Sequence, residues 1–150
     1  MKTIIFLFIF LTNILTIVGQ DSFKKYEVKS PLIYKKVQID YHSNPTARQF
    51  KTRIKNDYKI KEMNFAGHYS FIFWGCGSPC QTSVIVDVKT GKVYDGPTAA
   101  IGYDYHKDSK LLIVNPKDTT GIYTDCPYCI EEKWLWNEQR KRFDKLDDKN

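Results

Sequence analysis

The feature that most constrains this chain is a nearly uninterrupted apolar run over residues 4–18, preceded by one positive charge at Lys2 and followed by a small residue. A basic start, an apolar centre and a small residue near the cleavage point are the three parts of a secretory signal peptide. We therefore expect residues 1–19 to be a signal peptide and residues 20–150 to form a single globular domain, exported to the periplasm or secreted. An uncleaved membrane anchor is the alternative, because the run approaches the roughly 18 apolar residues of a spanning helix.

The remaining part of the chain has the size of one domain with a proper core, and it has no second long apolar run. We expect it to have no membrane span after signal cleavage. The whole chain has 23 Lys and Arg against 17 Asp and Glu, a formal net charge of +6. Such an excess favours acidic partners in general. We expect a monomer whose partner is an unknown protein or an anionic ligand, with no specific nucleic acid and no cofactor.

One amphipathic helix is predicted over residues 44–57. Asn44 can cap the free amides of a first turn, and Pro45 suits the first helical position because its missing N–H costs nothing there. Apolar residues then recur every three or four positions, which places them on one face of a helix. This apolar stripe consists of Ala47, Phe50, Ile54 and Tyr58.

Residues 68–146 are predicted to be rich in β-strands. Residues 69–74, 83–88 and 111–114 are aromatic or β-branched, and the turn around Gly91 is a strong hairpin signal. Successive hairpins after one helix predict an α+β fold, mainly an antiparallel β meander with one N-terminal amphipathic helix packed on one face. The tryptophans of residues 133–136 are expected in the core, with an exposed surface that stacks sugars or bases as the alternative.

The chain has four cysteines, Cys76, Cys80, Cys126 and Cys129. An even number in an exported chain indicates two disulfides, for which three connectivities are possible. The two close pairs are the simplest, and a crossed arrangement stays open. Four thiolates around one zinc ion are a further alternative, which export disfavours because thiols would oxidise first. We predict no metal site.

The densest group of unusual residues extends over residues 64–81. It contains glycines, a proline and two cysteines, so its backbone is expected to form a pinned loop that presents a rim of side chains to a ligand. The tentative binding residues are Asn64, His68, Trp74 and Gln81. The competing interpretation is a stapled β-turn in which His68 is structural.

The sequence Cys126-Pro127-Tyr128-Cys129 resembles the active-site tetrapeptide of glutaredoxins, which makes a thiol–disulfide oxidoreductase the alternative function. Its context differs, because the motif lies near the C-terminus and precedes an alternating, strand-like segment. Asp125 would also raise a neighbouring thiol pKa rather than lower it. We predict no catalytic residues, because no nucleophile, base and acid stand in a diagnostic arrangement.

Most of residues 20–150 resemble a family of small exported bacterial proteins of unassigned function. The shared order is a short helix, an N-F-A-G-H-Y stretch, a W-G-C-G-x-x-C loop, a D-x-K-T-G hairpin, a D-S-K-L-L strand and a tryptophan-bearing hairpin. In this chain these segments are residues 45–55, 64–69, 74–80, 87–91, 108–112 and 134–146. The resemblance brings no reaction with it, and the Cys126/Cys129 pair lies outside the pattern. We expect an exported, disulfide-stabilised, non-catalytic binding or interaction protein of the bacterial envelope, with a protein ligand as one possibility.

Overall fold

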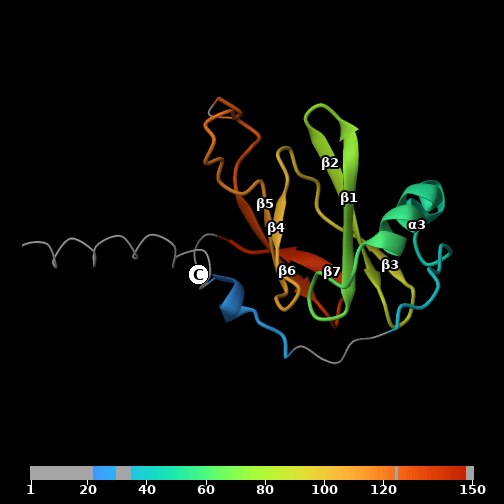
Figure 1. Cartoon of the computed structure of the whole chain (residues 1–150). Helices are drawn as coiled ribbons and strands as arrows, with labels where there is room; N and C mark the ends of the chain where they lie inside the picture. Colours follow the sequence, from blue (N-terminus) through green and yellow to red (C-terminus); the bar gives the residue numbers. More distant parts are fainter. Residues whose placement is uncertain (1–21, 30–34, 124, 148–150) are drawn as a thin grey trace, which may run out of the picture.

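The computed structural model describes residues 22–29, 35–123 and 125–147. The predicted signal peptide at residues 1–19 lies outside the described residues. Within them the chain forms two antiparallel β-sheets and a few short helices, a β-rich α+β arrangement (Figure 1). No helix of this part of the chain is long and apolar enough to cross a membrane.

Two short helices occupy the region where one was predicted. As expected, Asn44 caps the first of them, α2 (Pro45–Gln49), by accepting a hydrogen bond from the Ala47 amide at 3.1 Å. Phe50 then leaves the helical conformation, with φ −106° and ψ 28°, and α3 (Lys51–Ile60) begins after it. The prediction of one continuous helix over residues 44–57 was therefore wrong, because the backbone breaks at Phe50, whose ring packs 5.1 Å from that of Trp74.

The first sheet contains β1 (Tyr69–Gly77), β2 (Cys80–Asp87) and β3 (Val93–Asp95) in that order. Successive side chains of a strand point to opposite faces. In β1, Phe71 belongs to the core between the two sheets, whereas Ile72 and Trp74 belong to the core beneath α2 and α3. Both faces of this sheet are covered, which explains why β1 and β2 read as nearly continuous apolar runs.

The second sheet contains β4 (Tyr103–Tyr105), β5 (Leu111–Val114), β6 (Glu132–Asn137) and β7 (Arg142–Lys145), again in chain order. The hairpins were predicted as one meander, whereas the structure divides them into two sheets. Both tryptophans of residues 133–136 were expected in the core: Trp136 of β6 is buried there at 1% exposure, whereas Trp134 is only partly buried and packs against it. On the outer face of this sheet, Phe23 packs against Leu111 and Ile113. Figure 1 shows the resulting order of layers: the short N-terminal helix at residues 22–25, the second sheet, the first sheet and α3.

The turn between β2 and β3 fixes the position of the segment at residues 35–41. Gly91 has φ +76°, and a Cβ added there would lie 2.0 Å from the carbonyl oxygen of Gln38. The Asp40 amide donates to the Gly91 carbonyl oxygen at 2.9 Å, and the Val37 amide donates to that of Val88 at 3.1 Å. Only glycine allows this close approach, so residues 35–41 lie directly against the turn.

The cysteines form two short-range disulfides, Cys76–Cys80 and Cys126–Cys129. The first closes the tip of the β1–β2 hairpin, and the second lies in the long loop between β5 and β6. Both loops lie at the top of Figure 1, at the end of the molecule opposite to the start of β1. The crossed arrangement does not occur.

Candidate functional site

A polar pocket of about 530 Å³ lies where β1 begins. It is lined by Val28, Lys29, Ala66, Gly67, His68, Asp87, Lys89, Lys110, Glu138 and Lys141. These residues come from five separate stretches of the sequence, so only the folded chain assembles the pocket. We call this site the His68 pocket.

The turn before β1 positions His68. Ala66 and Gly67 both have positive φ, 44° and 83°, and their amides donate to the carbonyl oxygens of Ser109 and Lys107 at 3.2 and 2.7 Å. Two consecutive left-handed residues turn the chain sharply, and the two hydrogen bonds fix that turn to the loop between β4 and β5 of the second sheet. His68 follows immediately, and its carbonyl oxygen accepts from the Val88 amide at 3.0 Å.

Glu138, from the turn between β6 and β7, is the most heavily hydrogen-bonded side chain of the pocket. Its carboxylate accepts from the Tyr69 hydroxyl at 2.8 Å, from the Trp136 indole N–H at 2.7 Å and from the Lys141 ammonium. Burial alone would raise the pKa of Glu138, but these three donors together hold the pKa below its usual value. Glu138 is therefore ionised at neutral pH and joins β1 to β6 and to the turn that follows it.

Asp87, at the end of β2, is also hydrogen-bonded through both of its carboxylate oxygens. One of its carboxylate oxygens accepts from the Lys89 amide and the other from the Thr90 hydroxyl, both at 2.9 Å. These contacts form the Asx-type turn that the D-x-K-T-G sequence favours. The carboxylate of Asp87 thus has a structural role in the β2–β3 turn while it borders the pocket.

His68 lies between the two carboxylates. Its Nε2 is 3.9 Å from Oδ1 of Asp87 and 3.7 Å from Oε1 of Glu138, and its side chain is 16% exposed. Burial lowers the pKa of His68, and the nearby ammonium of Lys89 lowers it further, against the opposing effect of the two carboxylates. The imidazole is therefore neutral near pH 7 and retains one N–H donor.

The charges of the pocket are predominantly positive. Four lysines line it, Lys29, Lys89, Lys110 and Lys141, against two carboxylates. Because both carboxylates already accept hydrogen bonds from the protein, the surplus positive charge suits an anionic ligand. No serine, threonine or cysteine is among the described residues that line it, so they offer no hydroxyl or thiol nucleophile. In the described ranges no three His, Cys, Asp or Glu residues gather into a group that could hold a metal ion.

Of the residues predicted to bind a ligand together, only His68 lies in this pocket. Asn64 uses its side chain to pair with the backbone of Phe71, accepting from its amide at 2.7 Å and donating to its carbonyl oxygen at 3.3 Å. Trp74 is 7% exposed and packs under Phe50. Trp74 also lies six residues beyond His68, a separation of roughly 20 Å along an extended strand.

Gln81 lies near the disulfide end of the hairpin rather than beside His68. Its amide and carbonyl oxygen pair with the backbone of Ala99 at 2.7 and 2.9 Å, and its carbonyl oxygen also accepts from the Tyr103 hydroxyl at 2.9 Å. The structure therefore does not bring the four residues together into one rim. The partners that it does give to His68, notably Glu138 and Lys141, were not predicted.

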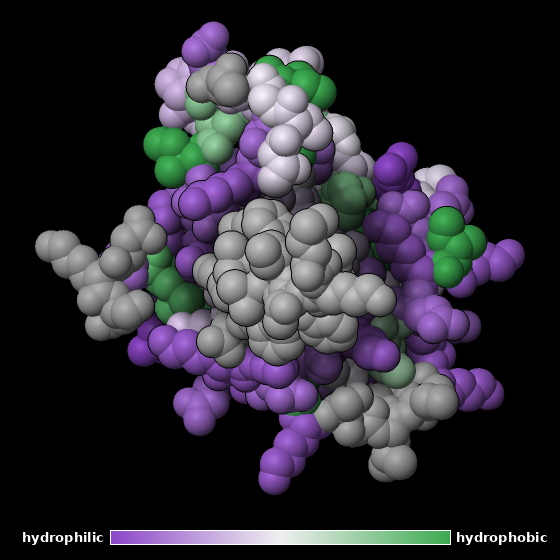
Figure 2. Space-filling model, turned by 60° about the vertical axis from the view of Figure 1, so that its left-hand side comes forward, coloured by the Kyte–Doolittle hydropathy of each residue, from purple (hydrophilic) through white to green (hydrophobic). Residues whose placement is uncertain are grey.

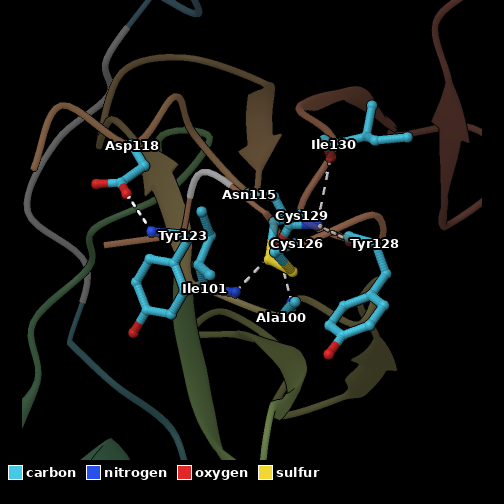
Figure 3. The surroundings of a disulfide bond; sticks show 9 residues. All are labelled: Ala100, Ile101, Asn115, Asp118, Tyr123, Cys126, Tyr128, Cys129 and Ile130. Atoms are coloured by element: carbon cyan, nitrogen blue, oxygen red, sulfur yellow. Dashed lines mark hydrogen bonds between the residues drawn. A yellow bond between two sulfur atoms is a disulfide. The ribbon is translucent and has the colours of Figure 1, made fainter. Parts of the chain in front are cut away.

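Asn115 organises the second disulfide loop (Figure 3). Its side-chain oxygen accepts from the amides of Ala100 and Ile101 at 2.7 and 3.1 Å. Its side-chain nitrogen donates to the carbonyl oxygens of Tyr128 and Ile130, both at 3.3 Å. Asn115 is 6% exposed and has φ +51°, a conformation that asparagine tolerates better than most residues. One side chain thus holds the Cys126–Cys129 loop against the segment that precedes β4.

The loop that Asn115 holds exposes several large apolar side chains, Ile122, Tyr123, Tyr128 and Ile130. Figure 2 shows apolar residues gathered at the upper end of the molecule, above a mostly hydrophilic surface.

Comparison with family models, with curated proteins and with solved structures finds no match to this chain. The function of the protein is therefore inferred from the geometry and the charges of its own residues.

Proposed function

We propose that this chain is an exported, non-catalytic binding protein of the bacterial envelope that holds a small anionic ligand in the His68 pocket. The observation that carries the proposal is the charge balance of the pocket. Lysines outnumber carboxylates by four to two, and both Asp87 and Glu138 are already hydrogen-bonded to the protein. An anion entering the pocket would meet lysine ammonium groups.

The segments that carry the resemblance to small exported proteins support the same location. Residues 64–69, 87–91, 108–112 and 134–146 each contribute at least one residue to the lining. These segments are distant in sequence and share no local structure, so their meeting at one pocket gives them a common role. Two segments of the resemblance contribute no residue to the lining: the helical segment at residues 45–55, and the W-G-C-G-x-x-C loop, whose tip lies at the opposite end of β1.

The disulfides support the proposed compartment. Bonds of this kind persist outside the cytoplasm, in the periplasm or the medium. Both close short loops at the same end of the molecule, away from the His68 pocket. We infer that they stabilise loops and take no part in binding the anion.

We place the thiol–disulfide oxidoreductase second. Redox motifs of this type place the first cysteine at a helix N-terminus, which lowers its thiol pKa. In the described residues no helix begins at Cys126, and the next element is the strand β6. Equilibration of the protein with glutathione buffers tests the point: a potential below about −300 mV for Cys126–Cys129 fits a structural bond, and a higher one restores the redox alternative.

The binding proposal is tested by titrating the purified protein with sulfate and with pyrophosphate, observed by NMR at the His68 ring and the neighbouring backbone amides. We expect saturable shifts confined to the lining of the pocket. Lys110→Gln should weaken binding, and the matched exposed change Lys107→Gln, outside the lining, should not. Shifts that are absent, or equal in the two variants, would show that the pocket does not hold these anions.

A further inference from the structure

A second hollow, of about 490 Å³, lies between α3 and the segment at residues 35–41. It is lined by Lys36, Val37, Gln38, Ile39, Tyr41, Lys51, Lys55, Tyr58 and Lys59. It shares no lining residue with the His68 pocket. We call it the α3 groove.

The floor of the α3 groove is apolar. Val37, Ile39, Tyr41 and Tyr58 contribute to it. Tyr58 donates its hydroxyl to the carbonyl oxygen of Val37 at 3.2 Å, so its polar atom is already bonded to the segment, and at 7% exposure its ring contributes only a small part of the floor. Val37 is 39% exposed, so part of the floor is open to solvent.

Lys36 links the two sides of the α3 groove, the segment at residues 35–41 and the helix α3. Its ammonium donates to the carbonyl oxygens of Tyr58, at 2.7 Å, and of Lys61, at the end of α3. Carbonyl oxygens at a helix C-terminus lack backbone partners and attract cations, so this contact caps α3. Lys36 is therefore part of the frame, and residues 35–41 are fixed beside the helix rather than loosely attached.

The rim of the α3 groove is cationic on the helix side. Lys51, Lys55 and Lys59 are spaced four residues apart, which places them in one row along α3. All three are exposed, and the ammonium of Lys51 lies 5.0 Å from the ring centre of Tyr41 across the groove. No acidic residue is among the described residues that line the groove. Asp57, on the same helix, is paired with Arg53 at 3.6 Å.

We infer that the α3 groove binds one molecule of an acyl carboxylate, a fatty-acid-like chain whose alkyl part lies on the apolar floor and whose carboxylate meets the row of lysines. An apolar floor alone would not select a headgroup, and a row of lysines alone would bind any small anion weakly. Together they match an amphiphile with one negative end, because the floor suits its alkyl chain and the row of lysines suits its carboxylate. The volume falls within the roughly 300–1,000 Å³ typical of small-molecule clefts.

The probe is dodecanoate below its micelle concentration, titrated calorimetrically into the purified protein. Three compounds separate the two contributions. Butyrate keeps the headgroup without the chain, dodecyltrimethylammonium keeps the chain with the opposite charge, and decanoate shortens the chain by two carbons. We expect saturable 1:1 binding of dodecanoate, weakened by up to about fifteenfold for decanoate, and no binding of the other two.

Two matched variants each replace two exposed lysines by glutamates, one pair inside the α3 groove and one pair outside it. Lys55→Glu with Lys59→Glu should weaken dodecanoate binding by about tenfold or more. Lys24→Glu with Lys107→Glu, on residues outside the α3 groove, should leave it unchanged. Lys59 lies in the last turn of α3, where a carboxylate opposes the helix dipole, so circular dichroism measures the unfolding midpoint of both proteins and binding is compared well below the lower one. Val37→Ser tests the floor without adding charge and should weaken binding of the chain.

Three results would overturn the inference. Dodecanoate and butyrate binding equally would show that the apolar floor is unused. Equal losses in the two charge-reversal variants would show a non-specific effect of net charge. Binding only to vesicles of anionic phospholipid, with none to monomeric dodecanoate, would show a surface that meets membranes rather than a site for one molecule.

Discussion

The hydroxyl of Tyr69 donates to Oε1 of Glu138 at 2.8 Å and thereby joins the first strand of one sheet to the turn between the last two strands of the other. Lys141 donates to both, reaching the Tyr69 hydroxyl at 3.1 Å. Tyr69 has no exposed surface, and burial together with the Glu138 carboxylate raises its pKa well above the usual value. The tyrosine is therefore a neutral donor at any physiological pH, and the pair connects the core to the His68 pocket.

Tyr69→Phe should lower the free energy of unfolding by about 1–2 kcal/mol, measured by urea denaturation at pH 7. The change removes one donor to a carboxylate that retains Trp136 and Lys141 as partners, which limits the loss. Tyr128→Phe is the control, because that side chain is 60% exposed, and it should have no effect. Equal midpoints for the parent and Tyr69→Phe would mean that the hydroxyl contributes nothing to joining the sheets.

Gly91→Ala should be among the most destabilising single changes in the described part of the chain. It combines a φ of +76° with a Cβ placed 2.0 Å from the Gln38 carbonyl oxygen, so the segment at residues 35–41 would have to move. We expect a loss of about 3 kcal/mol or more. Gly121→Ala separates the two causes, since Gly121 has φ +73° with nothing within 4 Å of the added Cβ.

For Gly121→Ala we expect only the cost of the left-handed conformation, about 1 kcal/mol. The thermal unfolding of both variants gives the comparison. Similar losses at the two positions would show that the close approach to Gln38 does not constrain the turn.

Asn115→Asp should loosen the Cys126–Cys129 loop while leaving the rest of the fold in place. Aspartate keeps the acceptor for the amides of Ala100 and Ile101 but loses the two donations to Tyr128 and Ile130. We expect faster amide hydrogen exchange in the loop, equivalent to about 1–2 kcal/mol of local stability. Asn56→Asp, at an exposed position on α3, is the isosteric control. Unchanged exchange in the loop would assign its order to the disulfide alone.

Features that depend only on residues close together in the sequence were predictable from it. The Asn44 cap, the D-x-K-T-G turn around Gly91 and the strand character of β1 and β2 all follow from residue types within a few positions of one another. The break at Phe50 was missed because the apolar spacing continues through it, and a pattern of side chains does not record a change in backbone angles.

The pocket itself could not be predicted, because its members meet only through the packing of the two sheets. Glu138 is separated from Tyr69 by 69 residues, and in the sequence it is one polar residue of an ordinary turn. Conversely, Trp74 and Gln81 looked like ligand-binding residues because they flank the glycines and cysteines. Trp74 instead packs under Phe50 in the core, and Gln81 pairs through its backbone with Ala99.

Because the pKa of His68 is lowered in the folded protein, the free energy of unfolding should depend on pH. In the unfolded chain the imidazole titrates near pH 6.5, whereas burial first, and then Lys89, lowers the pKa in the folded protein. The unfolded chain therefore binds more protons below about pH 6.5, and the contribution of His68 to stability is present above that pH and lost as the pH falls. Denaturation between pH 5 and 8 should show a decline in acid that His68→Gln reduces.

A bound anion should raise the pKa of His68, which is the opposite of the effect of burial. Sulfate in the His68 pocket would favour the imidazolium, so we expect it to raise the pKa of His68, measured by NMR, and to bind more tightly at pH 5.5 than at pH 7.5. Sulfate keeps its charge over this range, so the change in affinity belongs to the protein. The His42 ring, which lies outside the lining, serves as the internal control, and its NMR signals at pH 7.5 should not move when sulfate is added. A pKa of His68 that does not respond to sulfate would separate the histidine from the anion site and assign it to the packing of the β1 turn.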